Sequence, residues 1–246
     1  IMTVKYYDWV EYQSNFRPKK IAIKEISNGR ETSYYELNQR SKSLAGWLQK
    51  KGLKKGDRVA ILAHNCAEVF ELEFACGKIG GVELPLNWRL TKPELAYILN
   101  DSKPMCLIYS VEFKDIAQEL IKDCGIKNSL MLEEDNYGSE YEQAISENND
   151  FETVESNHDD LIMLMYTSGT TGHPKGAMIN HQMQFFNTVN LGATARITDK
   201  TIQLVVLPLF HTGGMNCYAN PILHNGGQIV LMLSLIHISE PTRLSA

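Results

Sequence analysis

The sequence of 246 residues has no block of basic residues and no long hydrophobic run. Its 24 basic and 29 acidic residues are spread along the chain and give a net charge of -5, so the basic patches that attract nucleic acid or anionic membrane are missing. The longest apolar runs, Leu161 to Met165 and Leu204 to Leu207, are far shorter than the roughly 20 residues that span a bilayer. The sequence therefore predicts neither a nucleic-acid partner nor a transmembrane segment.

Cysteine pairs and a leader sequence are lacking as well. The five cysteines are widely spaced, with no CxxC pair, which excludes the common zinc and redox motifs. We predict no metal-ligating residue in this chain. Residues 1–30 carry scattered charges and no apolar segment ahead of a cleavage site, so no signal peptide is indicated. We expect reduced, buried cysteines in a cytoplasmic protein.

What is present, from Thr32 onward, is an alternation of short β-branched or apolar runs with longer amphipathic segments. This pattern predicts an α/β fold with mostly parallel sheets and crossover helices. The predicted strands are residues 59–62, 82–84, 105–109, 130–132, 161–166, 203–206 and 228–232, with a further extended stretch at 177–179. The predicted helices are residues 37–48, 69–79, 112–122, 137–147, 181–192 and 215–223.

Capping signals mark the starts of two of these helices and of a further one that begins at Thr91. Ser33 with Glu36, and Thr91 with Glu94, have the spacing of capping boxes, and Asn65 is the candidate N-cap of the helix that carries residues 69–79. The acidic, Asn-rich residues 146–160 are predicted to form a solvated linker.

The stretch YTSGTTGHPKG, residues 166–176, combines glycines, hydroxyl side chains and one lysine directly after a predicted buried strand. Phosphate oxygens require inward-pointing N–H groups, small side chains and a compact positive charge. The stretch therefore predicts a polyphosphate-binding loop. The candidate phosphate-binding residues are Thr167, Ser168, Gly169, Thr170, Thr171, Gly172 and Lys175.

This loop differs from the P-loop pattern GxxxxGK[ST]. Its lysine follows Pro174 and has no Ser or Thr after it to hold magnesium, and no helix is predicted to begin there. A P-loop NTPase is therefore disfavoured. The alternative to a phosphate-binding loop is a flexible surface turn. Such a turn would not explain why Pro174, Lys175 and Gly176 follow the glycines in this order.

The stretch resembles the phosphate-binding signature of the adenylate-forming enzymes, which include acyl-CoA synthetases, aryl-CoA ligases, adenylation domains of peptide synthetases and beetle luciferases. Two further blocks resemble the same family in the same order. They are ACGKIGGVELPLNWRLTKPELAYILNDS, residues 75–102, and LPLFHTGG, residues 207–214.

The resemblance implies that a carboxylate attacks the α-phosphate of ATP to give an acyl-adenylate and pyrophosphate, after which a thiol displaces AMP. It implies that residues 167–172 hold the β- and γ-phosphates with Lys175 close by, and that ATP, Mg²⁺ and CoA take part. The partner is a small-molecule carboxylic acid, and a fatty or related acid is the expectation. The protein supplies positioning and charge neutralisation.

Three histidines and one pair of an aromatic and a basic residue are further candidates for a functional role. In the related block the residue at His211 lies near the bound carboxylate and the thiol channel, so His211 is the candidate catalytic residue; the alternative is a core histidine bonded to a backbone carbonyl. For His181 and His224 we expect an N-cap or surface role. Trp88 and Arg89 are predicted to be structural, with Arg89 paired to a local acid.

The resemblance covers only the first half of such an enzyme. No YGxTE-like block, no later TGD block and no C-terminal domain with its lysine follow, and LSLIHISEPTRLSA, residues 233–246, resembles the translation of transposon-end sequencing-adapter DNA. We therefore expect residues 1–232 to form a partial AMP-binding N-terminal domain and residues 233–246 to be a foreign tail, the alternative being a genuine divergent strand. The C-terminal domain is expected to be absent.

The sequence leaves three hypotheses about the function open. The first is an ATP-dependent acid–thiol ligase, of which this chain is an inactive part. The second is a noncatalytic nucleotide-binding module that ends near residue 232. The third is a relative that shares the motifs but not the thiol step with CoA, either a peptide-synthetase adenylation domain or a luciferase-like enzyme.

Overall fold

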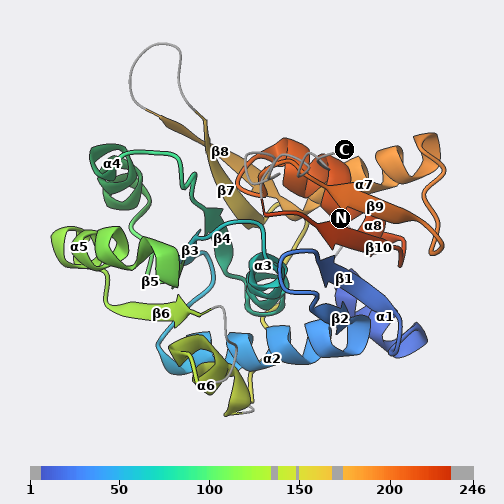
Figure 1. The fold of residues 1–246 in the computed structure, drawn as a ribbon, viewed down its shortest axis with the longest axis horizontal. Coiled ribbons are helices and arrows are strands. Elements are labelled where there is room, and N and C mark those ends of the chain that lie inside the picture. The colour runs from blue at the N-terminus through green and yellow to red at the C-terminus, as the bar shows by residue number, and fades with distance from the viewer. Residues whose placement is uncertain (1–6, 134–137, 148–149, 168–173, 234–246) are drawn as a thin grey trace, which may run out of the picture.

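Two β-sheets form the framework of the structure, a computed structural model that describes residues 7–133, 138–147, 150–167 and 174–233 (Figure 1). The six-stranded sheet has the order β6-β5-β3-β4-β7-β8, and only its β7–β8 pair is antiparallel. The four-stranded sheet has the order β2-β1-β10-β9, with β1, β10 and β9 parallel and β2 antiparallel to β1. The strands are β1 Ile21–Glu25, β2 Glu31–Ser33, β3 Arg58–Leu62, β4 Val82–Pro85, β5 Cys106–Ser110, β6 Asn128–Leu132, β7 Leu161–Thr167, β8 Lys175–Asn180, β9 Ile202–Val205 and β10 Gln228–Leu231.

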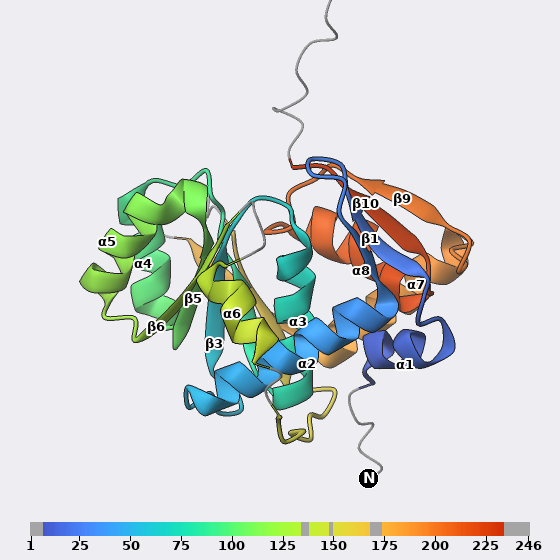
Figure 2. The ribbon, with the colours of Figure 1, turned by 60° about the horizontal axis from the view of Figure 1, so that its bottom comes forward.

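Helices separate the two sheets and cover the outside of the larger one. Helices α4 and α5 pack on the outer face of the six-stranded sheet, where they form a separate apolar cluster with β3, β4 and β5. Helices α2, α3 and α6 join both sheets in the main core (Figure 2). The helices are α1 Trp9–Phe16, α2 Tyr34–Lys50, α3 Ala67–Ile79, α4 Lys92–Ser102, α5 Lys114–Cys124, α6 Glu140–Ser146, α7 His181–Thr194 and α8 Asn220–His224, with a 3₁₀ turn η1 Val111–Phe113 and a π-helix η2 Gly213–Ala219.

The α/β class and the mostly parallel sheets are confirmed. Both predicted capping boxes are present, with Ser33 and Thr91 each bonded reciprocally to the glutamate three residues on. The predicted helix 215–223 is instead the π-helix η2 followed by α8. Elements α1, β1 and β2 were not predicted, although β1 is an inner strand of the smaller sheet. The tail residues 234–246 and Tyr137 lie outside the described residues.

Two sequence expectations about single residues were wrong. Cys66, not Asn65, precedes α3, and it caps the helix without a side-chain hydrogen bond. Of the cysteines, Cys76 and Cys106 are buried as expected, whereas Cys217 on η2 is exposed. Among the described residues, no helix is both long enough and apolar enough to span a membrane.

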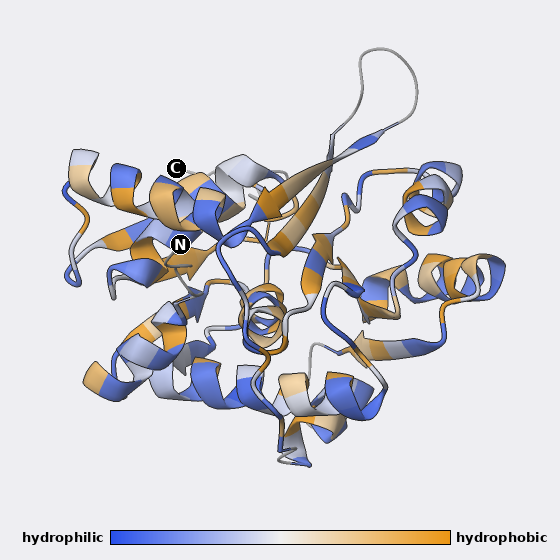
Figure 3. Ribbon diagram, turned by 180° about the vertical axis from the view of Figure 1, so that it is seen from behind, coloured by the Kyte–Doolittle hydropathy of each residue, from blue (hydrophilic) through white to orange (hydrophobic). Residues whose placement is uncertain are grey.

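Helix α3 is buried on every side. All of its residues are buried, although the helix carries three glutamates and a lysine. In Figure 3 hydrophobic residues lie on both strands and helices, and hydrophobic and hydrophilic residues alternate along α2. A helix in this position reads as nearly all apolar in most proteins, so the charges on α3 require partners.

Arginines from neighbouring elements supply partners for the first two of these glutamates. Arg40 Nε lies 2.6 Å from Glu71 Oε1, and Arg30 contacts both Glu68 and Glu71. The Tyr141 hydroxyl donates to Glu71 Oε2 at 2.7 Å. Because each buried carboxylate has a cationic partner, the cluster ties α2, α3 and α6 together without an isolated buried charge.

Replacing Arg40 by methionine tests this cluster. The variant keeps the apolar stem but leaves the fully buried Glu71 with fewer donors, and we expect it to lower the free energy of unfolding by about 3 kcal/mol. Urea unfolding followed by circular dichroism measures the difference. The matched control is Lys24→Met, which removes the exposed Lys24–Glu31 pair and should cost less than about 1 kcal/mol. Equal losses in the two variants would contradict a structural role for the buried cluster.

Candidate active site

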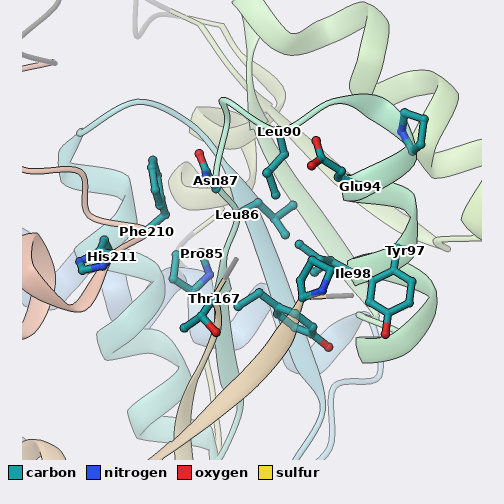
Figure 4. Close-up of a pocket in the computed structure, with 13 residues that line it drawn as sticks. Pro85, Leu86, Asn87, Leu90, Glu94, Tyr97, Ile98, Thr167, Phe210 and His211 are labelled. Atoms are coloured by element: carbon teal, nitrogen blue, oxygen red, sulfur yellow. The ribbon is translucent and has the colours of Figure 1, made fainter. Parts of the chain in front are cut away.

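A cavity of about 640 Å³ lies where β4 and β7 end. In open α/β sheets, ligands bind beyond the carboxyl ends of the strands, and this cavity has that position. Figure 4 shows its lining, which combines apolar side chains with a few polar ones. The lining residues are Pro85, Leu86, Asn87, Leu90, Pro93, Glu94, Tyr97, Ile98, Tyr166, Thr167, Pro174, Phe210 and His211.

The glycine-rich loop joins β7 to β8. Thr167 ends β7 and is paired with Lys175, the first residue of β8, in an antiparallel ladder. Both residues are exposed, and Thr167 Oγ1 lies 3.5 Å from the Lys175 carbonyl oxygen. The two ends of the candidate phosphate loop are therefore held side by side at the edge of the cavity. The remaining candidates, Ser168, Gly169, Thr170, Thr171 and Gly172, lie outside the described residues.

Tyr166 anchors this hairpin to α4. Its hydroxyl donates to Asp101 Oδ2, and burial, followed by the bond to Asp101, raises the pKa of Tyr166 well above its usual value. Gly176 lies against the same ring, since a Cβ there would approach Tyr166 Cζ to 3.2 Å. The hairpin that carries the loop is thus fixed to the helix that forms the opposite wall of the cavity.

The segment between β9 and η2 brings His211 to the same cavity. His211 is exposed, and its Nδ1 accepts a hydrogen bond from the Gly213 N–H at 3.1 Å. The ring therefore presents Nε2 as its other polar atom. The close backbone approach that the glycines suggest is present, because a Cβ on Gly214 would lie 2.3 Å from the Pro208 carbonyl oxygen. The structure thus places His211 and Thr167 on one cavity, whereas Lys175 is not part of the lining and is paired with Thr167 in the β7–β8 ladder.

Asn65 holds this segment in place, a role that the sequence did not reveal. It follows β3, and its amide donates to the carbonyl oxygens of Leu207 and Met232 at 3.0 and 3.1 Å. Its Oδ1 accepts from the Leu209 N–H at 2.9 Å. One side chain therefore joins the larger sheet to the end of the smaller one and to the segment that carries His211.

Aromatic rings connect the loop after β4 to the His211 segment. Trp88 lies edge-on to His64 and Phe210, at centroid distances of 4.5 and 6.2 Å. The Arg89 guanidinium lies 4.8 Å from the centre of the Trp88 ring and 5.9 Å from that of Phe210. The predicted pairing of Arg89 with a local acid was wrong: among the described residues it stacks on rings, and no ion pair of Arg89 is found.

His181 and His224 do not line the cavity, and the expected surface or N-cap role was wrong for His181. His181 is only 3% exposed and begins α7, whose N-cap is Asn180. Burial lowers the pKa of His181 to about 4. His224 ends α8 and packs edge-on against Trp9 and Phe185. His181 is therefore buried, and His224 is half-buried.

A two-sheet α/β domain with a partly apolar cavity at the strand ends is typical of an enzyme that binds a small molecule. A model of the AMP-binding enzyme family matches residues 10–245. The chain belongs to this family.

Curated relatives and solved structures are similar over nearly the whole chain. A feruloyl-CoA synthase from Amycolatopsis sp is 34% identical over 223 residues, which are 91% of this chain and 43% of the relative. A 2-succinylbenzoate–CoA ligase from Oceanobacillus iheyensis is 33% identical, with coverages of 88% and 42%. ATP-bound MatB from Rhodopseudomonas palustris superimposes with a TM-score of 0.82 at 29% identity, covering 93% of this chain and 46% of that one. The chain thus spans less than half the length of these proteins.

Adding a methyl group at Gly214 tests the close approach of its backbone to the Pro208 carbonyl group. Gly214→Ala forces the backbone away from Pro208, and we expect a loss of about 2 kcal/mol in the free energy of unfolding. The control is Gly213→Ala, whose Cβ meets only side-chain atoms, at 3.3 Å, and should cost less than about 1 kcal/mol. Thermal unfolding compares the two. If Gly214→Ala were as stable as the unchanged protein, the described approach would be incorrect.

Replacing Asn65 by leucine tests the link between the sheets. The variant keeps the volume but leaves one N–H and two carbonyl groups without their bonds, so we expect it to lose about 3 kcal/mol of unfolding free energy. Asn100→Leu is the matched control, because Asn100 is exposed and makes a single bond to the Ala96 carbonyl. Chemical denaturation of both variants gives the comparison, and a harmless Asn65→Leu would refute the link.

Proposed function

We propose that the full-length protein containing this chain is an ATP-dependent acid–CoA ligase. In the first step a carboxylate oxygen attacks the α-phosphorus of ATP, and the bond to pyrophosphate breaks. In the second step the thiol sulfur of CoA attacks the acyl carbon, and AMP leaves. The observation that carries the proposal is the pairing of Thr167 with Lys175, the two described ends of the signature, next to a cavity that Thr167 and His211 both line.

The two ends of the loop support different parts of this reaction. Residues 167–172 would bind the β- and γ-phosphates through backbone N–H groups and hydroxyls, as the composition of the stretch favours. Lys175 is exposed at the first position of β8, and its ammonium group would neutralise charge that builds up on the departing pyrophosphate.

His211 would orient the acid. Its Nδ1 is occupied by the Gly213 N–H, which fixes the ring and leaves Nε2–H as a donor toward the cavity. A carboxylate bound between His211 and Thr167 would lie close to the phosphate loop. The apolar part of the lining, with Leu86, Leu90 and Ile98, suits the carbon skeleton of an organic acid.

Magnesium would accompany the nucleotide. No group of three His, Cys, Asp or Glu side chains that could hold a metal occurs in the described part of the chain. Mg²⁺ is commonly bound by substrate phosphates with few protein ligands, so the residues described here fit a metal carried by ATP and supply no cage of their own. When bound, the ion would neutralise phosphate charge.

Acid-dependent exchange of pyrophosphate into ATP tests the first step. The full-length protein is assayed with ferulate, 2-succinylbenzoate and a long-chain fatty acid, the acid classes named in the relatives. We expect exchange with one of these acids and, on addition of CoA, the corresponding thioester. Lys175→Ala and Gly169→Val should each lower the exchange rate by about 100-fold.

The control is Lys200→Ala, which removes an exposed lysine far along the chain from the signature and should leave the rate unchanged. We expect the 246-residue chain alone to show no exchange, because it spans only 43% of the length of the related feruloyl-CoA synthase. Undiminished exchange in Lys175→Ala would contradict the proposed role of the loop, and exchange by the isolated chain would contradict its predicted inactivity.

A further inference from the structure

Glu73 is a buried carboxylate of α3 that no arginine or lysine contacts among the described residues. It is 1% exposed, and both of its hydrogen-bond donors are neutral amides. Gln184 of α7 and Asn220 of α8 donate to Glu73 Oε1, the latter at 2.8 Å. Unlike Glu68 and Glu71, Glu73 therefore does not belong to the arginine cluster, and its contacts reach toward the smaller sheet.

From Asn220 a chain of hydrogen bonds leads to the segment that carries His211. Asn220 Nδ2 also lies 3.2 Å from Asn216 Oδ1, and Asn216 Nδ2 lies 3.3 Å from Thr212 Oγ1. Thr212 directly follows His211 in the sequence. Asn216 and Asn220 are both buried, at 5% and 0% exposure. The chain therefore runs through the core from α3 to the edge of the cavity.

The element in the middle of this chain needs such support. Residues 213–219 form the π-helix η2, a conformation that is rare and is found mostly at functional sites. Asn187 of α7 donates to the Asn216 carbonyl oxygen at 2.6 Å, so η2 is held from α7 as well as from Asn220. Side chains outside the element thus supply part of what keeps η2 in this form.

A second buried carboxylate lies next to Glu73. Glu83 of β4 is fully buried, and neither of its oxygens has a hydrogen-bond partner in the described part of the chain. Glu73 Oε2 and Asn220 Oδ1 are also without partners there. Burial, followed by the negative charge of Glu73, raises the pKa of Glu83 well above its usual value, which favours the neutral form of Glu83. A neutral Glu83 avoids a pair of adjacent buried charges and adds an O–H donor to a region of unused acceptors.

We propose that Glu73 is a positioning residue for the active-site segment: through Asn220 and Asn216 it holds η2 so that His211 stays at the cavity. The inference rests on the proposed function for its consequence, the orientation of the acid, but the positioning itself can be measured without any reaction. Glu73 would act on the acid and not on the nucleotide, because its hydrogen bonds lead to Thr212, the neighbour of His211, and not to the β7–β8 hairpin.

Two substitutions of Glu73 in the full-length protein separate the acceptor from the charge. Glu73→Gln keeps an oxygen for Gln184 and Asn220, whereas Glu73→Leu removes it and leaves two buried amides without a bond. We expect amide hydrogen exchange of residues 207–220 to rise about tenfold in Glu73→Leu through the loss of these bonds, and to change less than about twofold in Glu73→Gln. In acid-dependent ATP–pyrophosphate exchange, Glu73→Leu should raise KM for the acid by about the same factor and leave KM for ATP unchanged.

Leu72→Ala is the matched control, since Leu72 is the fully buried neighbour of Glu73 on α3 and its truncation destabilises the core without touching the hydrogen bonds. It should not raise exchange selectively in residues 207–220 or change KM for the acid. If Glu73→Leu behaves like Leu72→Ala, the positioning role is overturned. If the unchanged protein shows no acid-dependent reaction, the proposed function fails, and hydrogen exchange still decides the positioning role.

A third variant keeps the test decisive if Glu73→Leu does not fold. Thr212 is exposed, so Thr212→Val removes the last hydrogen bond of the chain without disturbing the core. We expect hydrogen exchange of residues 207–220 to rise about threefold through the loss of this single bond. Unchanged exchange in Thr212→Val would mean that the chain does not restrain the segment, and the proposal would fall.

Discussion

The burial of α3 between the two sheets is the constraint on which the remaining structure depends. A helix with charged side chains can occupy the core only if each charge is neutralised or paired. Arg30 and Arg40 meet this requirement for Glu68 and Glu71, toward α2 and α6. Glu73 is accommodated by amides from α7 and α8 instead. The same helix therefore orients elements on both of its sides, and its polar groups fix which elements can pack there.

The candidate site follows from this arrangement because its walls come from both sheets. The larger sheet contributes the ends of β4 and β7, and the smaller one contributes the segment after β9. Two polar links hold these walls in register: Asn65 bonds the segment from the larger sheet, and the amides around Glu73 reach it through the core. The edge-on contact of Trp88 with Phe210 adds an aromatic link between the same two walls. A cavity built at such a junction depends on distant buried residues as much as on its own lining.

Signals from residues close together in the sequence predicted most helices and strands. Such signals could not predict contacts between residues that are far apart in the sequence. The pairs Ser33–Glu36 and Thr91–Glu94 act within one helical turn, so their capping boxes could be read from spacing. The alternation from Thr32 onward predicted the larger sheet, since parallel strands are buried on both faces. Asn65 looked like a cap because its neighbours in sequence suited one; its real partners lie more than a hundred residues away. The π-helix η2 was read as an α-helix because its apolar pattern is compatible with both.

In the candidate site, too, residue types could be recognised from the sequence, whereas contacts made by folding could not. The signature at residues 166–176 and the HTGG stretch could be found from residue types alone, because phosphate binding and close backbone approach both demand small residues. Glu73 and Glu83 gave no such signal, since an acidic residue within an apolar run is usually assigned to a solvated face. Their burial appears only when β4 and α3 are packed together, and it places two carboxylates where neither is contacted by a cation from the described residues. Such a costly arrangement in the core, connected by hydrogen bonds to the segment that carries His211, is better explained by what it positions than by any stability it could provide.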